Sequence, residues 1–255
     1  MTKQPVYFFG HGSPMIGIEE NSFTHILIEI GKSFIENPKA IMMISAHWLT
    51  RGTFAATTPN PETIHDFGGF PEELYRIKYP APGSPEFARE VINLVPDILE
   101  NDKRGLDHGC WTILNHIFPN ADIPVFQLSI DYYKPMQYHF DLAKKLKPMR
   151  GKGLLIIGSG NIVHNLNQWF NRNNDNPYSW ALEFDEWVKG KIIGRDFQSL
   201  IDYEKQGDAA RMSVPTVDHF VPLIYCLGLA DESDGIEFVY EGVESSLSMR
   251  SLRIG

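Results

Sequence analysis

The chain has 255 residues, of which 43% are hydrophobic and 22% are charged, and its formal net charge is -9 at pH 7. This length suits one large α/β domain or two small ones, since a single core stops growing at roughly 250–300 residues. The negative charge and the lack of clustered Lys and Arg argue against a nucleic acid or an anionic membrane surface as partner.

The chain has two cysteines, Cys110 and Cys226, which are far apart and lack CxxC spacing. We therefore expect no disulfide framework, and we expect the protein to reside in a reducing compartment. The apolar run near the N-terminus is too short for a signal peptide. No stretch approaches the ~20 apolar residues of a membrane helix. We expect a cytoplasmic protein that does not span a membrane.

Four short apolar runs, each followed by small or polar residues, predict strands. Near-continuous apolar runs of this length fit strands that are buried on both faces, which is the pattern of a parallel sheet. The runs are Val6–Gly10, Ala40–Ala46, Ile123–Ile130 and Gly153–Gly160.

Longer amphipathic segments between these runs predict helices that would cover the sheet. One of them begins with Ser84 as a possible N-cap, Pro85 at the first helical position and Glu86 in the first turn. The predicted helices are Phe23–Glu36, Ser84–Leu99, Pro135–Leu146 and Ser179–Ile193.

The segments Ile236–Gly242 and Ser246–Ile254 predict a closing β-hairpin, antiparallel to the rest of the sheet. The chain contains no repeat, no low-complexity tract and no obvious linker. We therefore predict an α/β fold in which a mostly parallel central sheet is flanked by helices and ends in a C-terminal antiparallel β-hairpin. Residues 1–255 are expected to form a single domain.

The segment Thr58–Gly83 has the densest turn chemistry of the chain, with five prolines, three glycines and several aromatic residues. A loop this long and this apolar is more often a lid or the wall of a pocket than a bare connection.

Histidines follow the predicted strands. His11 and His47 come at the ends of the first two runs, and His164 follows the fourth run by a few residues. Ligands of open α/β sheets bind in the crevice beyond the carboxyl ends of the strands. Imidazoles gathered there indicate a metal site or acid/base catalysis. A lone histidine is more often a surface or core residue, which is what we expect of His25, His116 and His139, because no motif supports a functional role for them.

Other motifs carry weaker signals. "GSGNIVH", residues 158–164, contains G-x-G but lacks the third glycine of a dinucleotide fingerprint. Ser13 is not in a G-x-S-x-G elbow, so a hydrolase nucleophile is not indicated. His108 beside Asp107, and His219 near the start of a helix, are open between a structural and a functional role from these patterns alone.

Taken together and in order, the motifs resemble those of class III extradiol ring-cleavage dioxygenases, and within them the DOPA 4,5-dioxygenase-like branch. The resemblance covers nearly the whole chain, from about Phe8 to the C-terminus. Its motifs are "GHGSP", "SAHW", "IHDFGGFPEELY", "YPAPGSP", "LDHG.W", "ADIPVFQLSID", "GSGNIVHNL" and "PT..HF.PL".

The resemblance implies one divalent metal, held by His11, His47 and His219. His164 matches the acid/base position of protocatechuate-type relatives, and it also corresponds to a metal ligand in zinc-containing relatives of this branch. The protocatechuate type has a carboxylate as third ligand, and we find no equivalent Glu here. Two histidines and a carboxylate indicate iron(II), whereas a face of three or four imidazoles suits zinc(II) equally well.

The resemblance also implies the reaction, in which a catechol such as DOPA is opened by O2 to a semialdehyde. His164 is the first choice for the acid/base and His108 the second, since histidine titrates near the working pH. His65, Phe67 and Tyr75 on the loop are candidates for substrate binding, with loop capping or packing as the alternative.

For an amino-acid catechol, Arg51 or Arg76 could meet the carboxylate. Two other functions stay open beside the dioxygenase. One is a zinc hydrolase in which the histidines hold an activated water, and the other is a non-catalytic metal-binding relative. The pattern leaves the oligomeric state undetermined.

Overall fold

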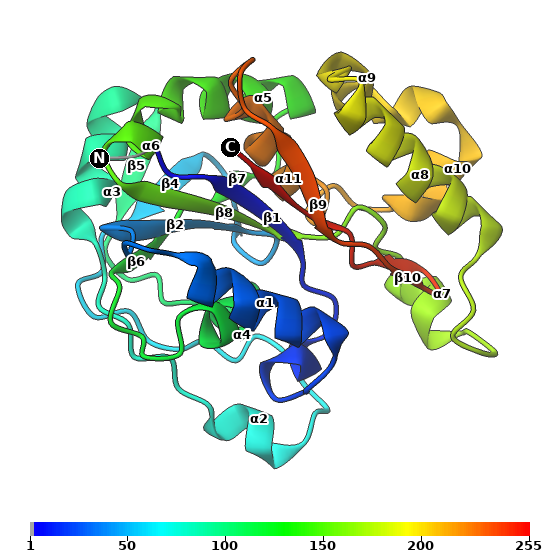
Figure 1. Cartoon of the computed structure of the whole chain (residues 1–255), viewed down its shortest axis with the longest axis horizontal. Coiled ribbons are helices and arrows are strands. Elements are labelled where there is room, and N and C mark those ends of the chain that lie inside the picture. The colour runs from blue at the N-terminus through cyan, green and yellow to red at the C-terminus, as the bar shows by residue number, and fades with distance from the viewer. Residues whose placement is uncertain (1–2) are drawn as a thin grey trace.

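A six-stranded sheet runs through the middle of the computed structural model, which describes residues 3–255 (Figure 1). Its strand order is β6-β2-β8-β1-β12-β9. The four neighbouring strands from β6 to β1 are parallel, as the apolar runs predicted. These strands are β1 (Val6–Gly10), β2 (Ala40–Ser45), β6 (Val125–Gln127) and β8 (Leu154–Gly160).

The C-terminal part closes the sheet with antiparallel strands, which confirms the predicted hairpin. β12 (Ser251–Ile254) pairs with β1, and β9 (Ile236–Tyr240) pairs with β12. The connection between them carries a second, smaller antiparallel pair, formed by β10 (Val243–Glu244) and β11 (Leu247–Ser248).

Both faces of the sheet are buried because side chains alternate along each strand. In β1, Val6 and Phe8 enter one core, whereas Tyr7 and Phe9 enter the other. The core around Tyr7 is covered by α1 (Ser22–Ser33) and α4 (His108–Ile117), below the sheet in Figure 1. Across the sheet, the core around Phe8 is covered by several helices, among them α5 (Met136–Leu146), α8 (Ser179–Ile193) and α11 (Val221–Gly228).

The remaining helical elements are short and lie mostly in the connections. They are η1 (Pro14–Gly17), α2 (Glu72–Arg76), α3 (Pro85–Leu94), α6 (Pro148–Gly151), α7 (Leu166–Phe170), α9 (Phe197–Ile201), η2 (Tyr203–Gln206) and α10 (Asp208–Ser213).

The predicted helix Ser84–Leu99 was too long. Helix α3 ends at Leu94, because the residues after it form strand β5 (Ile98–Asn101), which pairs with β4 (Thr53–Ala56). Ser84 does occupy the N-cap position, but its side chain makes no capping hydrogen bond.

The predicted strand Ile123–Ile130 is two strands. After β6, the backbone N–H groups of Leu128 and Ser129 donate to the Met43 and Phe54 carbonyls in turn, so the chain leaves β2. It then forms β7 (Ile130–Asp131), which pairs with β3 (Leu49–Thr50).

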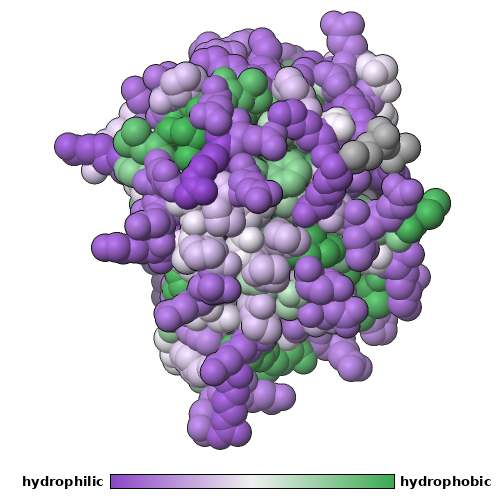
Figure 2. Space-filling model, turned by 90° about the vertical axis from the view of Figure 1, so that its left-hand side faces the viewer, coloured by the Kyte–Doolittle hydropathy of each residue, from purple (hydrophilic) through white to green (hydrophobic). Residues whose placement is uncertain are grey.

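Within residues 3–255, no helix has the length and apolarity needed to cross a membrane. Figure 2 views the left-hand side of Figure 1, where the surface is largely hydrophilic and its apolar side chains form separate patches.

Candidate metal centre and adjoining cavity

The carboxyl ends of three parallel strands bring the predicted histidines together. His11 follows β1 directly, and its backbone N–H donates to Gly160 at the end of β8 (3.1 Å). The backbone N–H of Ala46 likewise donates to the Ser159 carbonyl (3.0 Å). This hydrogen bond fixes the backbone just before His47. The shared edge of the sheet thus sets the separation of the two imidazoles.

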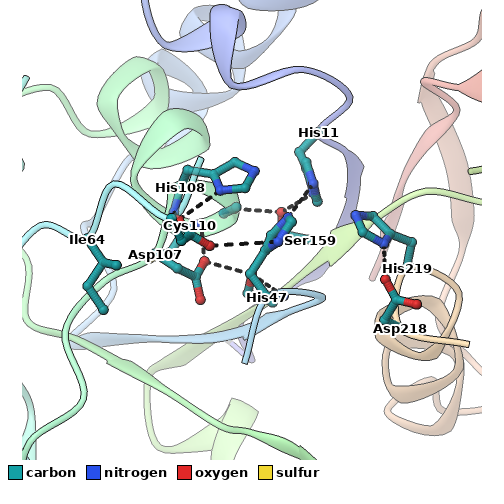
Figure 3. A network of polar contacts seen from close by, with 12 residues as sticks. His11, His47, Ile64, Asp107, His108, Cys110, Ser159, Asp218 and His219 are labelled. Carbon is teal, nitrogen blue, oxygen red and sulfur yellow. Dashed lines mark hydrogen bonds and ion pairs between the residues drawn. The ribbon is translucent and has the colours of Figure 1, made fainter. Parts of the chain in front are cut away.

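Three imidazoles converge at this edge. The Nε2 atoms of His11 and His47 are 3.0 Å apart. Together with His219, which precedes α11, they offer three ligand nitrogens that all lie within 4.8 Å of one another. Figure 3 shows these rings gathered around one region, with His108 beside them.

Hydrogen bonds determine which nitrogen of His11 carries the proton. The Ser159 hydroxyl donates to the Gly109 carbonyl, so it must accept at its oxygen from His11 Nδ1, at 3.0 Å. The Nε2 atom of His11 is then unprotonated and turned toward His47. This is the arrangement in which a second group orients a metal-binding imidazole.

His219 is oriented in a similar way. Its Nδ1 atom donates to the carboxylate of Asp218, which leaves Nε2 with a free lone pair. The Nδ1 atom of His47 lies 3.7 Å from an oxygen of Asp66, beyond hydrogen-bonding distance but on the side away from His11. The Nε2 atoms of His11 and His47 are close enough for one imidazole to donate a hydrogen bond to the other, a contact that a bound cation would replace. The donor set fits a divalent metal such as zinc or iron.

Burial keeps these imidazoles neutral. It is the largest cause that lowers the pKa of His47 to about 4, and repulsion from His108 adds to it. The pKa values of His11 and His219 lie well below the ordinary value. Burial is the largest cause, and repulsion from the neighbouring imidazoles is the second. A neutral imidazole is the form that binds a metal.

His108 stands beside His47, with ring centroids 3.9 Å apart. Its Nδ1 atom donates to Asp66 (2.9 Å). Burial alone would raise the pKa of Asp66, but the hydrogen bonds from His108 outweigh it and hold that pKa well below its usual range. The partner that orients His108 is thus Asp66 on the loop, and not its chain neighbour Asp107.

Asp107 instead supports the site from behind. It is fully buried and caps helix α4 by accepting from the Cys110 N–H. It also accepts from the Ser45 hydroxyl (2.7 Å) and pairs with Arg104. Because Ser45 accepts from the His47 N–H (3.2 Å), one carboxylate joins the backbone at His47 to the start of the helix that carries His108.

His164 lies at the edge of the cluster. Its ring stacks on that of His219, with centroids 3.4 Å apart and planes at 7°. It shares a possible ligand group with Asp218 and His219, and not with His11 and His47. Burial lowers the pKa of His164 to about 4.

A cavity of about 350 Å³ opens over the histidines. Its walls include residues of the loop 58–83, of α7 and of β11. Its lining residues are His11, Gly12, Ser13, Pro14, His47, Asp66, Phe67, Phe70, His108, His164, Leu166, Trp169, Phe170, His219 and Leu247.

Of the three loop residues predicted to bind substrate, Phe67 lines this cavity. His65 and Tyr75 are not in the lining. The His65 ring lies against Phe67 and Trp111, and its Nε2 atom contacts the Ile77 carbonyl (3.0 Å). Tyr75 also packs on Phe67. The two residues therefore support the loop behind Phe67, which was the alternative role considered for them.

The two cations suggested for a substrate carboxylate lie elsewhere, so that suggestion was wrong. Arg51 packs over the ring of Tyr133, 4.9 Å from its centroid, and Arg76 pairs with Glu72 at 2.6 Å. Neither lines the cavity.

The less favoured motifs have structural roles. The Ser13 side chain accepts from the Met15 N–H at the start of η1. A Cβ atom on Gly160 would lie 2.2 Å from the His219 carbonyl oxygen, so this glycine allows the His219 segment to pack against β8. His116 and His139 contact the Ile16 carbonyl and the Tyr225 hydroxyl.

Two groups of site residues were not predicted from the sequence. One is the set of histidine partners, Asp66, Ser159 and Asp218. The other is the wall on α7, although the apolar residues Leu166, Trp169 and Phe170 stand at helical spacings of three and four. That spacing was a signal that could have revealed the wall.

Comparison with known proteins gives a family match. Residues 5–251 match a family model described as the catalytic LigB subunit of aromatic ring-opening dioxygenase.

Curated relatives and a solved structure agree over nearly the whole chain. A protein of Escherichia coli K12 named 4,5-DOPA dioxygenase extradiol is 42% identical, over 100% of this chain and 96% of its own length. A protein of Beta vulgaris with the same name is 35% identical, over 94% and 92%. The crystal structure of an uncharacterized protein from Escherichia coli K12 superposes with a TM-score of 0.85 at 37% identity, and the match covers 99% of this chain and 100% of the other.

Proposed function

The chain belongs to the family of catalytic LigB subunits of aromatic ring-opening dioxygenases, and from this premise we propose that it cleaves a catechol such as DOPA at the 4,5 bond with O2. As a member of this family it is a metal-dependent extradiol dioxygenase that acts on an aromatic substrate and O2. The observation that supports the site most is the convergence of three imidazole nitrogens at the floor of an aromatic-walled cavity.

His11, His47 and His219 are the proposed metal ligands. When bound, the metal would supply a Lewis acid for the two catechol oxygens and, if it is iron, a redox-active centre through which electrons of the catecholate can reach O2, which zinc cannot provide because it has no redox chemistry. We therefore propose iron(II) for the active enzyme and zinc(II) as an ion that the same ligands can hold.

His164 is the proposed acid/base. Its ring lines the cavity beside His219 and is neutral at pH 7, because burial lowers its pKa to about 4. This pKa lies below the working pH, and not near it as expected for a free histidine. It can accept a proton from a catechol hydroxyl and return it as the ring opens, a role that contributes about 10²–10⁴-fold to a rate. His108 is the second candidate, since Asp66 fixes its Nδ1 proton and leaves Nε2 free.

The loop supplies the contact for the substrate ring. Phe67 meets His108 edge to face, with centroids 5.5 Å apart and planes at 85°. A catechol over the histidines would pack against this ring, which favours a flat aromatic substrate and keeps water away from the reacting bond.

The dioxygenase is favoured over the alternatives of a zinc hydrolase and a non-catalytic metal-binding protein. The family match names ring opening, and the cavity offers aromatic walls and a further histidine that a metal-binding scaffold does not need. We further propose that residues 1–255 act as one catalytic domain. Cys110 and Cys226 are both free and buried, which supports a reducing compartment such as the cytoplasm.

The proposal is tested by reconstituting the metal-free protein anaerobically with iron(II) or with zinc(II). Oxygen uptake is then measured with DOPA and with simple catechols, and the product is followed as a yellow semialdehyde. We expect uptake with iron only, one O2 per ring opened, and none in the His47→Ala variant. His25→Ala, an exposed histidine on α1, is the matched control and should keep its activity.

No uptake with either metal, together with tight zinc binding, would contradict the dioxygenase and leave the hydrolase or the non-catalytic protein. Uptake that persists in His47→Ala would contradict the proposed ligand set instead.

A further inference from the structure

The outer nitrogens of the three proposed ligand imidazoles have partners of different kinds. Ser159 and Asp218 hold the Nδ1 atoms of two of them by hydrogen bonds. Among residues 3–255, the one carboxylate within 4 Å of the third, Nδ1 of His47, is that of Asp66, at 3.7 Å. The loop 58–83, which walls the cavity, thus also brings a charge to the metal centre.

The two oxygens of Asp66 lie near different rings. Its Oδ1 atom accepts from both the backbone N–H (3.0 Å) and the Nδ1–H (2.9 Å) of His108, whereas Oδ2 is the atom 3.7 Å from Nδ1 of His47. The two rings lie against each other, with centroids 3.9 Å apart. An aspartate that accepts two hydrogen bonds is ionised at neutral pH, so a single negative charge acts on both imidazoles.

A carboxylate beside Nδ1 controls which nitrogen of an imidazole carries the proton. In the free protein, Nε2 of His47 lies within hydrogen-bonding distance of Nε2 of His11 (3.0 Å). A metal ligand needs its nitrogen unprotonated, so the proton of His47 belongs on Nδ1, the atom that faces Asp66. For His108, the hydrogen bond from Nδ1 to Asp66 already leaves Nε2 with a free lone pair. Both rings line the cavity, so both lone pairs are available to what binds there.

From this geometry we propose that Asp66 is a positioning residue shared by two imidazoles with different tasks. Through His47 it strengthens metal binding. Through His108 it keeps an Nε2 lone pair ready to accept a proton from a catechol hydroxyl, whose oxygen retains the bonding electron pair. This inference rests on the proposed ligand set and ring-cleavage function. Because the next residue, Phe67, packs on His108 and lines the cavity, the loop joins contact with the substrate ring to both tasks.

The role toward His47 is tested with Asp66→Asn. The amide keeps an oxygen that can accept from His108, but it loses the charge and its second group becomes a donor. We expect the zinc affinity, measured by competition with a chelator, to fall about 10–100-fold, while the melting temperature changes little. Asp66→Glu retains the charge and should lose less affinity than the amide. Glu62→Gln removes a charge from an exposed side chain of the same loop, outside the cavity, and should leave the affinity unchanged.

The role toward His108 is tested with 4-nitrocatechol, whose visible absorption reports how many of its hydroxyls are ionised. The probe is bound to zinc-saturated protein, which does not turn over. We expect less of the doubly ionised form in Asp66→Ala than in the wild type, and the same reduction in His108→Gln. The double variant should show little further loss, because Asp66 acts on the probe through His108 and the two effects are then not additive.

Failure of this inference is distinct from failure of the proposed function, because both measurements use the zinc protein. Unchanged zinc affinity in Asp66→Asn, or additive effects of Asp66→Ala and His108→Gln on the probe, overturns the proposal that one carboxylate serves both rings. If Asp66→Ala does not fold, Asp66→Asn takes its place in the same cycle. If the expected effects appear but the iron protein takes up no O2 with any catechol, the inference about Asp66 holds and ring cleavage is overturned.

Discussion

The two ends of strand β1 carry two buried polar clusters that differ in how completely they are partnered. At the amino end, the guanidinium of Arg150 is 1% exposed and donates to three backbone carbonyls, those of Gln4, Leu229 and Ile254. Its charge is matched by Asp234 at 2.6 Å. Each nitrogen of the Arg150 side chain has a partner in the folded chain.

At the carboxyl end, the outer nitrogens of the imidazoles have partners and the inner ones face one another. Ser159 and Asp218 hold His11 and His219 from outside, while the Nε2 atoms of His11 and His47 stand 3.0 Å apart. A cluster with every group paired contributes to stability, whereas one whose ligand nitrogens converge on one point is arranged for a bound ion. The comparison predicts that changes at one end affect activity and that changes at the other affect stability.

The largest effect is expected from His164→Gln. If His164 is the acid/base, kcat should fall about 10²–10⁴-fold while metal affinity and melting temperature change little. Steady-state oxygen uptake, metal titration and thermal unfolding separate these quantities. His25→Gln serves as the control. A variant that loses its metal in parallel with its activity would show that His164 is a ligand.

Arg150→Met tests the other end. It leaves the Asp234 carboxylate and three carbonyls without their main partner, and breaking a buried ion pair costs about 3–5 kcal/mol. For a chain of this size that lowers the melting temperature by roughly 6–20 °C. The kcat of the folded variant should match the wild type, with Arg211→Met, an exposed arginine, as control. A reduced kcat at unchanged stability would break the division between the two ends.

The sequence predicted the sheet and the histidine positions because both depend on local pattern. Apolar runs of five to eight residues predicted β1, β2 and β8, and the ends of the first two runs indicated His11 and His47. For His219, the sequence pattern did not decide between a structural and a functional role. Only the resemblance to a family identified it as a metal ligand.

Hydrogen-bond and strand partners that come from distant parts of the chain could not be predicted from local sequence patterns. His108 adjoins Asp107 in the chain, but the fold brings Asp66, 42 residues earlier, to its ring. The predicted helix Ser84–Leu99 included the first two residues of β5, because the pairing of this strand with β4 cannot be recognised from the periodicity of its own residues. Tertiary contacts decided both cases.

Asp218→Asn gives a smaller effect at the histidine end. The amide can present its NH₂ group to Nδ1 of His219, so the carboxylate no longer fixes the tautomer that frees Nε2. Removing such an outer partner typically costs 10–100-fold in metal affinity or activity. Competition with a chelator measures the zinc affinity, and Asp208→Asn, whose carboxylate is exposed, is the control. An unchanged affinity would show that His219 is oriented by packing alone.

The smallest effect is a pH dependence at the amino end, seen by comparing wild type with Asp234→Asn. Burial alone would raise the pKa of Asp234, but hydrogen bonds from Arg150 and Lys3 outweigh it and lower that pKa to about 2. Because the folded pKa lies below the unfolded value of about 4, the carboxylate stabilises the fold above pH 4 or so. That stabilisation, about 2 kcal/mol at most, is lost as the pH falls toward 2. Urea unfolding between pH 7 and 2 should therefore show the two proteins converging, mostly below pH 4. A gap that stays constant over this range would mean that the pairing with Arg150 does not depend on the charge of Asp234, and the amino end would then owe its stability to the carbonyls alone.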